Sequence, residues 1–301
     1  MDGQPVLHPL PLKGNEFTGR NAGIAVVIST YNTPDFLHLT LEGYRQQTDR
    51  HFSIYIADDG STDETCALIR QMQADFPVPV QHIRQADDGF RKARIHNEVI
   101  RRISEPYTLL TDGDCIPLPG LIAAHRTFAR DDCFISGSRV LLSQDWTRSL
   151  CREKPFNAGH SGWWWITQRL RSNINRLLPL IMPSGISSPE KKLDGIRGCH
   201  LSCSTDALLR INGFDESFEG WGREDSDLTA RLLHAGLLRL NLRGTPVLHL
   251  WHKAFSRHRL NDNDAALQAC LNERRIEAVY GLRQLEKPAG INNNGSVLID
   301  D

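Results

Sequence analysis

Short apolar runs alternate with longer amphipathic stretches from Gly23 to about Val140, and this alternation constrains the fold more than any other feature. The expected strands lie at residues 24–28, 53–57, 78–83 and 107–111. The first of them is entirely apolar and bounded by polar residues, as is typical of a buried parallel strand. Helices are expected from about residue 34, at 62–74 and at 90–103. The sequence therefore predicts an α/β protein with a mostly parallel central sheet flanked by helices.

Charge and cysteine content exclude several classes of protein. The 35 basic and 36 acidic side chains give a formal charge of −1, so we expect no nucleic-acid partner. No apolar stretch approaches about 18 residues, so no membrane span is predicted. The seven cysteines form no CxxC pair, and the N-terminus carries no apolar signal-peptide core. These features favour a reducing, cytoplasmic setting.

Two acidic clusters follow predicted strands, where ligands bind in parallel sheets. In Asp112-Gly113-Asp114, carboxylates two residues apart on extended backbone point to one side and suit Mg²⁺ or Mn²⁺. A plain surface turn is the alternative interpretation. In Asp58-Asp59-Gly60-Ser61, the following residues cap a helix, which does not require two acids. One of the two carboxylates could accept the imide N–H of a uracil ring.

A third cluster combines an aromatic ring with acids at a helix start. Residues 220–227 read Gly-Trp-Gly-Arg-Glu-Asp-Ser-Asp, and helix capping explains only part of this pattern. Trp221 between two glycines offers a flat face for a sugar ring, and a neighbouring carboxylate could act as a general base on a hydroxyl group. His249 and His252, which follow a short strand at 245–248, are candidates for a third metal ligand.

Taken in this order, the clusters resemble glycosyltransferase family 2, which has the GT-A fold. The matching pieces are residues 26–32, the turn at 58–61, the motif at 112–114 and the Glu224-Asp225 pair. The phrase at 88–94, followed by Asn97, is similar to the branch related to the N-terminal transferase domain of bacterial chondroitin polymerase. Residues 220–225 are similar to an element of that branch and of β-1,4-galactosyltransferases. The resemblance covers about residues 23–142 and 195–255.

The resemblance implies a role for each matching residue. The nucleoside, expected to be uridine, would be held by Thr30, by Asp58 or Asp59, by Arg84 or Arg94, and by Asp112 with Gly113. Mn²⁺ or Mg²⁺ would bind Asp112, Asp114 and His252, with His249 as the alternative. Asp225 would be the catalytic base, Glu224 would orient the acceptor, and Trp221 with Gly222 would wall the sugar site. One displacement assisted by one base inverts the anomeric configuration.

The resemblance also implies a domain organisation. An N-terminal extension occupies residues 1–22, and the GT-A domain spans 23–260. Within it, a nucleotide-binding half (23–142) and an acceptor-side half (195–260) flank an insertion at 143–194. A C-terminal helix from about Asn263 to Leu285 and a frayed tail complete the chain at 261–301, with no second catalytic domain expected.

The insertion carries Trp163-Trp164-Trp165 and several arginines, and one amphipathic helix is predicted in it. Such a helix could dock a lipid-linked acceptor at the inner face of the cytoplasmic membrane, and the alternatives are a lid or a helix packed on the core.

The expected reaction is transfer of a sugar from a nucleotide donor to a glycan or lipid-linked glycan during synthesis of bacterial surface polysaccharide or lipopolysaccharide. Two other functions stay open from the sequence. One is a catalytically silent GT-A module that binds a nucleotide or glycan. The other is a nucleotidyltransferase, although the first strand is followed by Ser29-Thr30-Tyr31-Asn32 rather than by a phosphate-binding loop rich in Gly, Arg and Lys.

Overall fold

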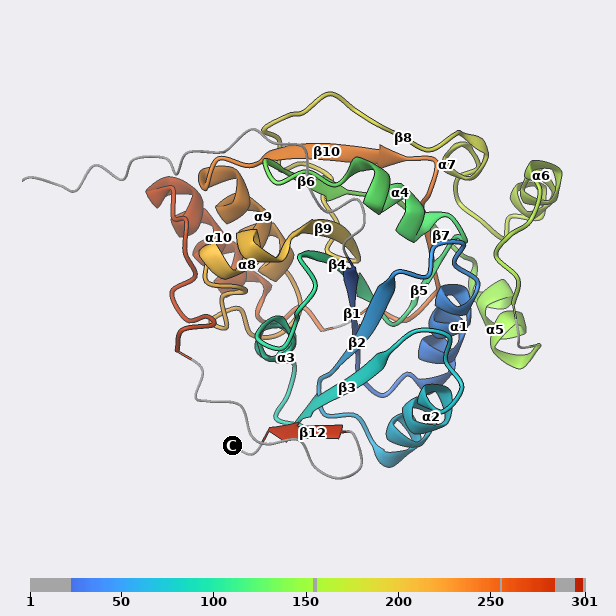
Figure 1. Cartoon of the computed structure of the whole chain (residues 1–301), viewed down its shortest axis with the longest axis horizontal. Helices are drawn as coiled ribbons and strands as arrows, with labels where there is room; N and C mark the ends of the chain where they lie inside the picture. Colours follow the sequence, from blue (N-terminus) through green and yellow to red (C-terminus); the bar gives the residue numbers. More distant parts are fainter. Residues whose placement is uncertain (1–22, 154–155, 255, 285–295, 300–301) are drawn as a thin grey trace, which may run out of the picture.

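A mixed sheet of nine strands forms the centre of the molecule in the computed structural model, which describes residues 23–153, 156–254, 256–284 and 296–299 (Figure 1). The predicted extension at 1–22 lies outside these residues. The sheet has the order β12-β3-β2-β1-β4-β9-β6-β10-β8. Its strands are β1 (Ile24–Thr30), β2 (Phe52–Asp58), β3 (Val80–Gln85), β4 (Tyr107–Asp112), β6 (Cys133–Ser136), β8 (Gly185–Ile186), β9 (His200–Ser204), β10 (Leu238–Arg243) and β12 (Ser296–Ile299).

A smaller sheet of three strands lies beside it, in the order β5 (Cys115–Pro117), β11 (Val247–His249) and β7 (Arg139–Leu141). The helices are α1 (Pro34–Arg45), α2 (Asp63–Gln73), α3 (Lys92–Ile100), α4 (Leu121–Phe128), α5 (Gln144–Arg152), α6 (Gly162–Leu170), α7 (Leu178–Ile181), α8 (Thr205–Arg210), α9 (Glu224–His234) and α10 (Leu260–Glu273).

The first four strands and their helices form the parallel part of the sheet, as the alternation predicts. β1 lies between β2 and β4 and is parallel to both. The chain therefore winds to one side through β2 and β3 and to the other through β4, which makes the carboxyl ends of β1 and β4 the place where a ligand crevice opens. Beyond β4 the sheet is mixed, because β9 runs antiparallel to both β4 and β6.

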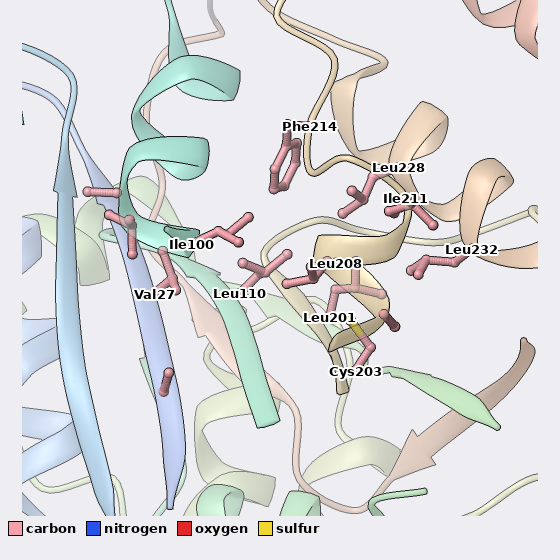
Figure 2. Packing of buried hydrophobic residues seen from close by; sticks show 14 of the residues in the cluster. Val27, Ile100, Leu110, Leu201, Cys203, Leu208, Ile211, Phe214, Leu228 and Leu232 are labelled. Carbon is pink, nitrogen blue, oxygen red and sulfur yellow. The ribbon is translucent and has the colours of Figure 1, made fainter. Parts of the chain in front are cut away.

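Helices cover both faces of the sheet because successive residues of β1 alternate between two cores. Ile24, Val26 and Ile28 pack in one cluster with side chains of α1, α2 and α4. Ala25 and Val27 pack in the other with α3, α8 and α9. Figure 2 shows this second core, in which Val27 and Leu110 of the sheet face Leu208, Leu228 and other apolar side chains of the helices. A strand apolar on both faces is thus explained by burial on both faces.

Several predicted boundaries differ from the structure. The third strand begins at Val80 rather than at residue 78, and α3 ends at Ile100 rather than at residue 103. The prediction of one helix in the insertion is wrong, because α5, α6 and α7 all lie there. α10 covers Leu260–Glu273 instead of reaching residue 285, and within the tail that was expected to fray, Ser296–Ile299 form β12 beside β3.

The insertion packs against the small sheet, at the side of the molecule next to α1 (Figure 1). Trp165 is buried there with Val140 and Leu248, so this tryptophan stabilises the fold. Trp163 on the same helix is 80% exposed, and so is Leu170. In the part of the chain that the structure describes, no helix is both long enough and apolar enough to cross a bilayer.

Two buried histidines form a hydrogen-bonded pair beneath β9. His125 Nε2 lies 2.9 Å from His200 Nε2, and His200 Nδ1 lies 3.1 Å from the carbonyl oxygen of Ser138. Because a carbonyl only accepts, His200 carries its proton on Nδ1 and accepts at Nε2 from His125. His125 Nδ1 lies 2.8 Å from the hydroxyl oxygen of Ser202. Burial of both rings favours their neutral forms in the folded protein.

This pair makes stability depend on pH. Burial lowers the pKa of His200 to about 4 and that of His125 well below its usual value. The unfolded chain binds these protons below about pH 6.5 and the folded chain does not, so their contribution to stability is lost as pH falls. When the pH falls from 7.5 to 5.5, each histidine is expected to lower the unfolding free energy by about 1.4 kcal/mol.

Urea unfolding of the wild type and of His125→Gln at the two pH values checks this expectation. The variant should lose about 1.4 kcal/mol less than the wild type on acidification, since one titrating ring is gone. A His51→Gln control, at an exposed position, should retain the wild-type difference. An identical pH response of the wild type and His125→Gln would contradict the assignment.

Candidate functional site

The carboxyl ends of β1 and β4 are held together by hydrogen bonds that fix the Asp112-Gly113-Asp114 turn. Ser29 pairs with Asp112 in the sheet register, and its hydroxyl donates to Asp112 Oδ1 over 2.8 Å. The Gly113 amide donates to the carbonyl oxygen of Ser29 at 2.7 Å. A Cβ at Gly113 would lie 3.0 Å from that oxygen and 3.3 Å from the Thr30 hydroxyl. Glycine is therefore needed here for close approach of the two strands.

A cavity of about 500 Å³ opens at this edge, and we call it the donor cavity. Most of the predicted site residues that line it come from the ends of β1, β4 and β11 and from the loop before α9. These lining residues are Thr30, Asp59, Asp112, Gly113, Asp114, Trp221, Glu224, His249 and His252. Thus segments more than 200 residues apart in the sequence meet at one cavity, as expected for the crevice of a parallel sheet.

Asp112 is paired with a lysine that the sequence did not single out. Lys92 Nζ lies 2.7 Å from Asp112 Oδ1 and 3.8 Å from Glu224 Oε1. Burial alone would lower the pKa of Lys92, but the two carboxylates outweigh it and raise that pKa. In turn Lys92 outweighs the effect of burial on Asp112, whose pKa falls to about 2. Asp112 and Lys92 are both charged at neutral pH.

Glu224 responds differently to the same lysine. Burial raises its pKa to about 7, because Lys92 at 3.8 Å offsets only part of the desolvation. Its Oε2 atom is buried without a hydrogen-bond partner. Glu224 can therefore hold or release a proton near neutral pH and has an oxygen available to a ligand.

Asp114 faces both candidate histidines. Its Oδ2 atom lies 3.2 Å from His252 Nε2 and 3.6 Å from His249 Nε2. Burial lowers the pKa of His249, which keeps the ring neutral and able to ligate a cation. The thiol of Cys115 is also near, but burial raises its pKa well above the usual value, so it stays protonated. The available donors are one carboxylate and two imidazoles.

The structure separates the two aspartates of this motif by their partners. The sequence predicts that Asp112, Asp114 and one histidine bind a single cation. In the structure, Asp112 contacts Lys92 and Ser29, whereas the groups facing Asp114 are His249 and His252. Both carboxylates nevertheless line the donor cavity, and His249 is among the groups that lower the pKa of Asp112. Binding of one cation by Asp112, Asp114 and a histidine therefore stays a prediction.

Of the two acids after β2, only Asp59 reaches the donor cavity. Asp58 is fully buried, accepts from the Ser61 amide at 2.8 Å and lies 2.8 Å from His82 Nε2. It therefore holds the turn together. Asp59 accepts from the Arg91 amide at 3.0 Å and from Gln85, and burial raises its pKa to about 6. The sequence left open whether Asp58 or Asp59 would contact the nucleoside. The position of Asp59 at the donor cavity favours Asp59 for this role.

The structure places neither predicted arginine among the residues that line the donor cavity. Arg84 donates to the carbonyl oxygen of Ser61 at 2.6 Å, under the turn. Arg94 lies on α3, near Glu216. The basic side chains that line the cavity are instead Lys92, Arg139, Lys253 and Arg257. Lys92 belongs to the sequence segment 88–94, on which part of the family resemblance rests. That resemblance was the only sequence signal that pointed to Lys92.

The loop before α9 presents Trp221 to the cavity. Gly220, Gly222 and Arg223 all have positive φ values, of +71°, +111° and +78°, so the chain turns sharply at this point. Trp221 is 37% exposed, and the Arg257 guanidinium lies 5.1 Å from its ring centroid. Gly222 does not line the cavity, and its carbonyl oxygen accepts from the Asn263 side chain at 2.8 Å.

Asp225 is the first-turn neighbour of Glu224 but points elsewhere. Its Oδ2 atom accepts from the Gly198 amide at 2.7 Å, and it does not line the donor cavity. Asp227, two residues on, is fully buried and paired with Arg231 at 2.8 Å. The acids at the start of α9 thus divide into one at the cavity wall, one beside Gly198 and one that stabilises the core.

Comparison with known proteins identifies the family of this chain. The model of glycosyl transferase family 2 matches residues 25–186, and the model of the N-terminal domain of galactosyltransferase matches 185–253. Chondroitin synthase of Pasteurella multocida is 25% identical over 264 residues, which cover 77% of this chain and 26% of that protein. Validoxylamine A glucosyltransferase of Streptomyces hygroscopicus is 27% identical, covering 78% of this chain and 53% of the relative. The chain thus spans between about a quarter and a half of these relatives.

Solved structures share the fold. TarS 1–349 of S. aureus in complex with UDP-GlcNAc superimposes with a TM-score of 0.56 at 10% identity, covering 87% of this chain and 68% of TarS. The mannosyltransferase PcManGT of Pyrobaculum calidifontis, in complex with GDP-Man and Mn²⁺, gives a TM-score of 0.53 at 16% identity over 81% of this chain and 61% of its own. The family model covers more than half of the 301 residues. This chain belongs to glycosyltransferase family 2 and has the GT-A fold.

Proposed function

We propose that this enzyme transfers a sugar from a nucleotide donor, UDP-linked, to a glycan or lipid-linked glycan with inversion of configuration. The observation that carries the proposal is the donor cavity, which brings Asp59, Asp114, Glu224, Trp221 and two histidines to the carboxyl ends of β1 and β4. Asp59 is suited to the imide N–H of uracil, and Thr30 Oγ1 is buried there without a partner. The UDP-GlcNAc complex of TarS supports a UDP donor, although the GDP-Man complex of PcManGT shows that the fold also accepts guanosine.

A divalent cation fits beside Asp114. The side chains that would hold it are Asp112, Asp114 and His252, with His249 as the alternative, an oxygen and nitrogen set that favours Mn²⁺ over Mg²⁺. Bound there, a cation supplies positive charge to the leaving diphosphate. Lys92 adds a fixed positive charge at Asp112, and Arg139, Lys253 and Arg257 line the same cavity. These groups lie where negative charge grows as the sugar–phosphate bond breaks.

Asp225 is proposed as the base and Glu224 as the group that orients the acceptor hydroxyl. The Gly198 amide donates to one oxygen of Asp225, and among the described residues the other oxygen accepts from the Ser226 hydroxyl at 3.4 Å. In the reaction, this oxygen takes the hydroxyl proton while the acceptor oxygen bonds to the anomeric carbon and the nucleoside diphosphate departs. One displacement with one base leaves the configuration inverted.

The insertion is proposed to contact the membrane surface at the cytoplasmic side, where a lipid-linked acceptor would be presented. The exposed side chains of Trp163, Leu170, Leu178 and Ile181 support this placement, because they offer apolar contacts at the periphery of the molecule. The product would be a bacterial surface polysaccharide or lipopolysaccharide. As part of this proposal, residues 143–194 form an insertion between the nucleotide-binding half and the acceptor-side half of the GT-A domain.

Release of nucleoside diphosphate from a panel of nucleotide sugars tests the function. With Mn²⁺, the wild type should hydrolyse one UDP-sugar slowly, and addition of acceptor should speed UDP release. Asp114→Ala should need a Mn²⁺ concentration about tenfold higher or more for half-maximal rate, because a ligand is lost. Binding of a nucleotide sugar with no release under any condition would point to the catalytically silent module instead. Release of pyrophosphate from a nucleoside triphosphate and a sugar phosphate would point to a nucleotidyltransferase.

A further inference from the structure

A second cavity, of about 670 Å³, adjoins the donor cavity and shares Arg139 and Leu141 with it. We call it the arginine cavity, because its described lining contains five arginines and no aspartate or glutamate. The five are Arg139, Arg176, Arg197, Arg239 and Arg243. The whole chain has 35 basic and 36 acidic side chains, so this positive charge is a local concentration.

The partners of these arginines show which of them are available to a ligand. Arg239 is buried and structural: it donates to the Ser136 hydroxyl at 2.8 Å and to the Asp194 carbonyl oxygen at 2.7 Å, with Glu190 3.9 Å away. Arg197 and Arg243 are exposed, and within the described ranges their hydrogen-bond acceptors are backbone carbonyl oxygens, of Ile196 and Ile186 respectively. In the described part of the chain, no carboxylate pairs with either of them or with Arg139 or Arg176.

Several like charges around one cavity repel each other, and an anion between them relieves this repulsion. A guanidinium group is planar and presents two parallel N–H donors, so it binds a carboxylate or phosphate through two oxygens. On the α7 side, Leu178, Pro179 and Met182 line the same cavity. The cavity thus combines oxyanion-binding groups with an apolar wall.

Two connections place this cavity on the acceptor side of the reaction. Arg139 and Leu141 of β7 line both cavities, so the two meet at this strand. In addition, Arg197 of the arginine cavity is followed in the chain by Gly198, and the Gly198 amide donates a hydrogen bond to Asp225. A ligand anchored at the arginines therefore lies next to the proposed base and next to the donor cavity.

We propose that the arginine cavity is an acceptor subsite that binds an oxyanion, a carboxylate or a phosphate, carried by the acceptor close to the hydroxyl that is glycosylated. The inference rests on the proposed function, since it needs an acceptor. It adds the chemical class of that acceptor, which is anionic and whose negative charge is bound by Arg197 and Arg243.

The test uses three matched probes that differ only at carbon 6 of the sugar: methyl glucoside, methyl glucuronide and methyl glucoside 6-phosphate. Binding is measured by isothermal titration calorimetry on the full chain saturated with UDP and Mn²⁺, so that the donor cavity is occupied. We expect at least one anionic probe to bind about tenfold more tightly than the neutral one, with the preference falling as salt is raised. The carboxylate and phosphate probes identify which oxyanion is preferred.

Arg243→Gln and Arg197→Gln should each reduce the anionic preference at least about threefold, because one guanidinium is lost. A mainly structural role would instead lower the melting temperature and leave the preference intact. Arg70→Gln, an exposed position on α2, is the matched control and should bind like the wild type. Equal affinity for the three probes, no binding of the anionic ones at millimolar concentration, or an unchanged preference in both variants overturns the inference.

Failure of this inference can be told apart from failure of the proposed function. UDP release by the wild type in the presence of Mn²⁺ reports on the donor cavity alone. If that release occurs and the probes bind without charge preference, only the anionic subsite is wrong. If no nucleotide sugar is turned over, the function itself fails, whatever the arginines bind.

Discussion

Asp225→Asn is expected to lower kcat for sugar transfer by about 10²- to 10⁴-fold while leaving the affinity for UDP nearly unchanged. The factor is what a positioned general base contributes, since asparagine cannot take the proton from the acceptor hydroxyl. Affinity should persist because Asp225 does not line the donor cavity. Asparagine can still accept from the Gly198 amide through its carbonyl oxygen, so the loop and the start of α9 should be preserved.

The measurement is steady-state transfer, with UDP affinity determined separately by calorimetry. Asp206→Asn is the matched control, because Asp206 also lies in the first turn of a helix but is exposed and paired with Arg210. It should retain wild-type kcat. Full activity in Asp225→Asn together with loss of activity in Glu224→Gln would assign the base to Glu224. In that case the rate of the wild type should rise with pH around 7, where Glu224 titrates.

Arg231→Ala is expected to cost about 3–5 kcal/mol of unfolding free energy, the largest loss of stability that we predict. Arg231 and Asp227 are both fully buried, with Nε and Oδ2 2.8 Å apart. The guanidinium also donates to the carbonyl oxygens of Ile211 and Gly213 at 2.8 and 2.7 Å. Removing it leaves a buried carboxylate and two carbonyl oxygens unpaired, as when any buried ion pair loses one partner.

Urea unfolding of Arg210→Ala provides the control. Arg210 forms the same i,i+4 contact with Asp206 at 2.8 Å, but Asp206 is largely exposed and Arg210 is only half-buried, so the pair is open to solvent. Exposed pairs contribute about 0–1 kcal/mol, so this variant should be near wild type. The double variant Asp227→Leu/Arg231→Met should recover much of the lost stability, because no unpaired charge remains. Equal stability of Arg231→Ala and Arg210→Ala would contradict the role of the buried pair.

The parallel half of the fold could be predicted from the sequence because its signals are local. A fully apolar run such as 24–28 can only be a strand or helix buried on all sides, and its length favours a strand. Polar residues at the ends of such strands then fall at one edge of the sheet, which is why Asp112, Asp114 and the two histidines at the end of β11 line one cavity. For these residues, the position along the predicted strand was enough to place the side chain at this edge of the sheet.

The remaining parts depend on contacts between distant segments, which local pattern does not encode. Asp58 and Asp59 look alike in sequence, yet one bonds to His82 on β3 and the other faces the cavity. Asp227 resembles the neighbouring acids Glu224 and Asp225 in sequence, and only its contacts with Arg231, which also bonds to the loop at 211–213, show that it belongs to the core. The insertion has no clear hydrophobic pattern in its sequence, because its helices bury only part of their apolar surface. Trp165 lies in the core, for example, and Trp163 does not.

β1 has a consequence for how this chain can vary in length. Seven residues serve three purposes at once: alternate side chains fill two cores, Ser29 pairs with Asp112, and Thr30 pairs with Asp58. Deleting one residue would exchange the two apolar sets between the faces and shift both terminal hydroxyl groups out of place. Insertions and deletions are therefore confined to the loops, and a homologue that keeps this chemistry must keep the spacing from Ile24 to Thr30 residue for residue.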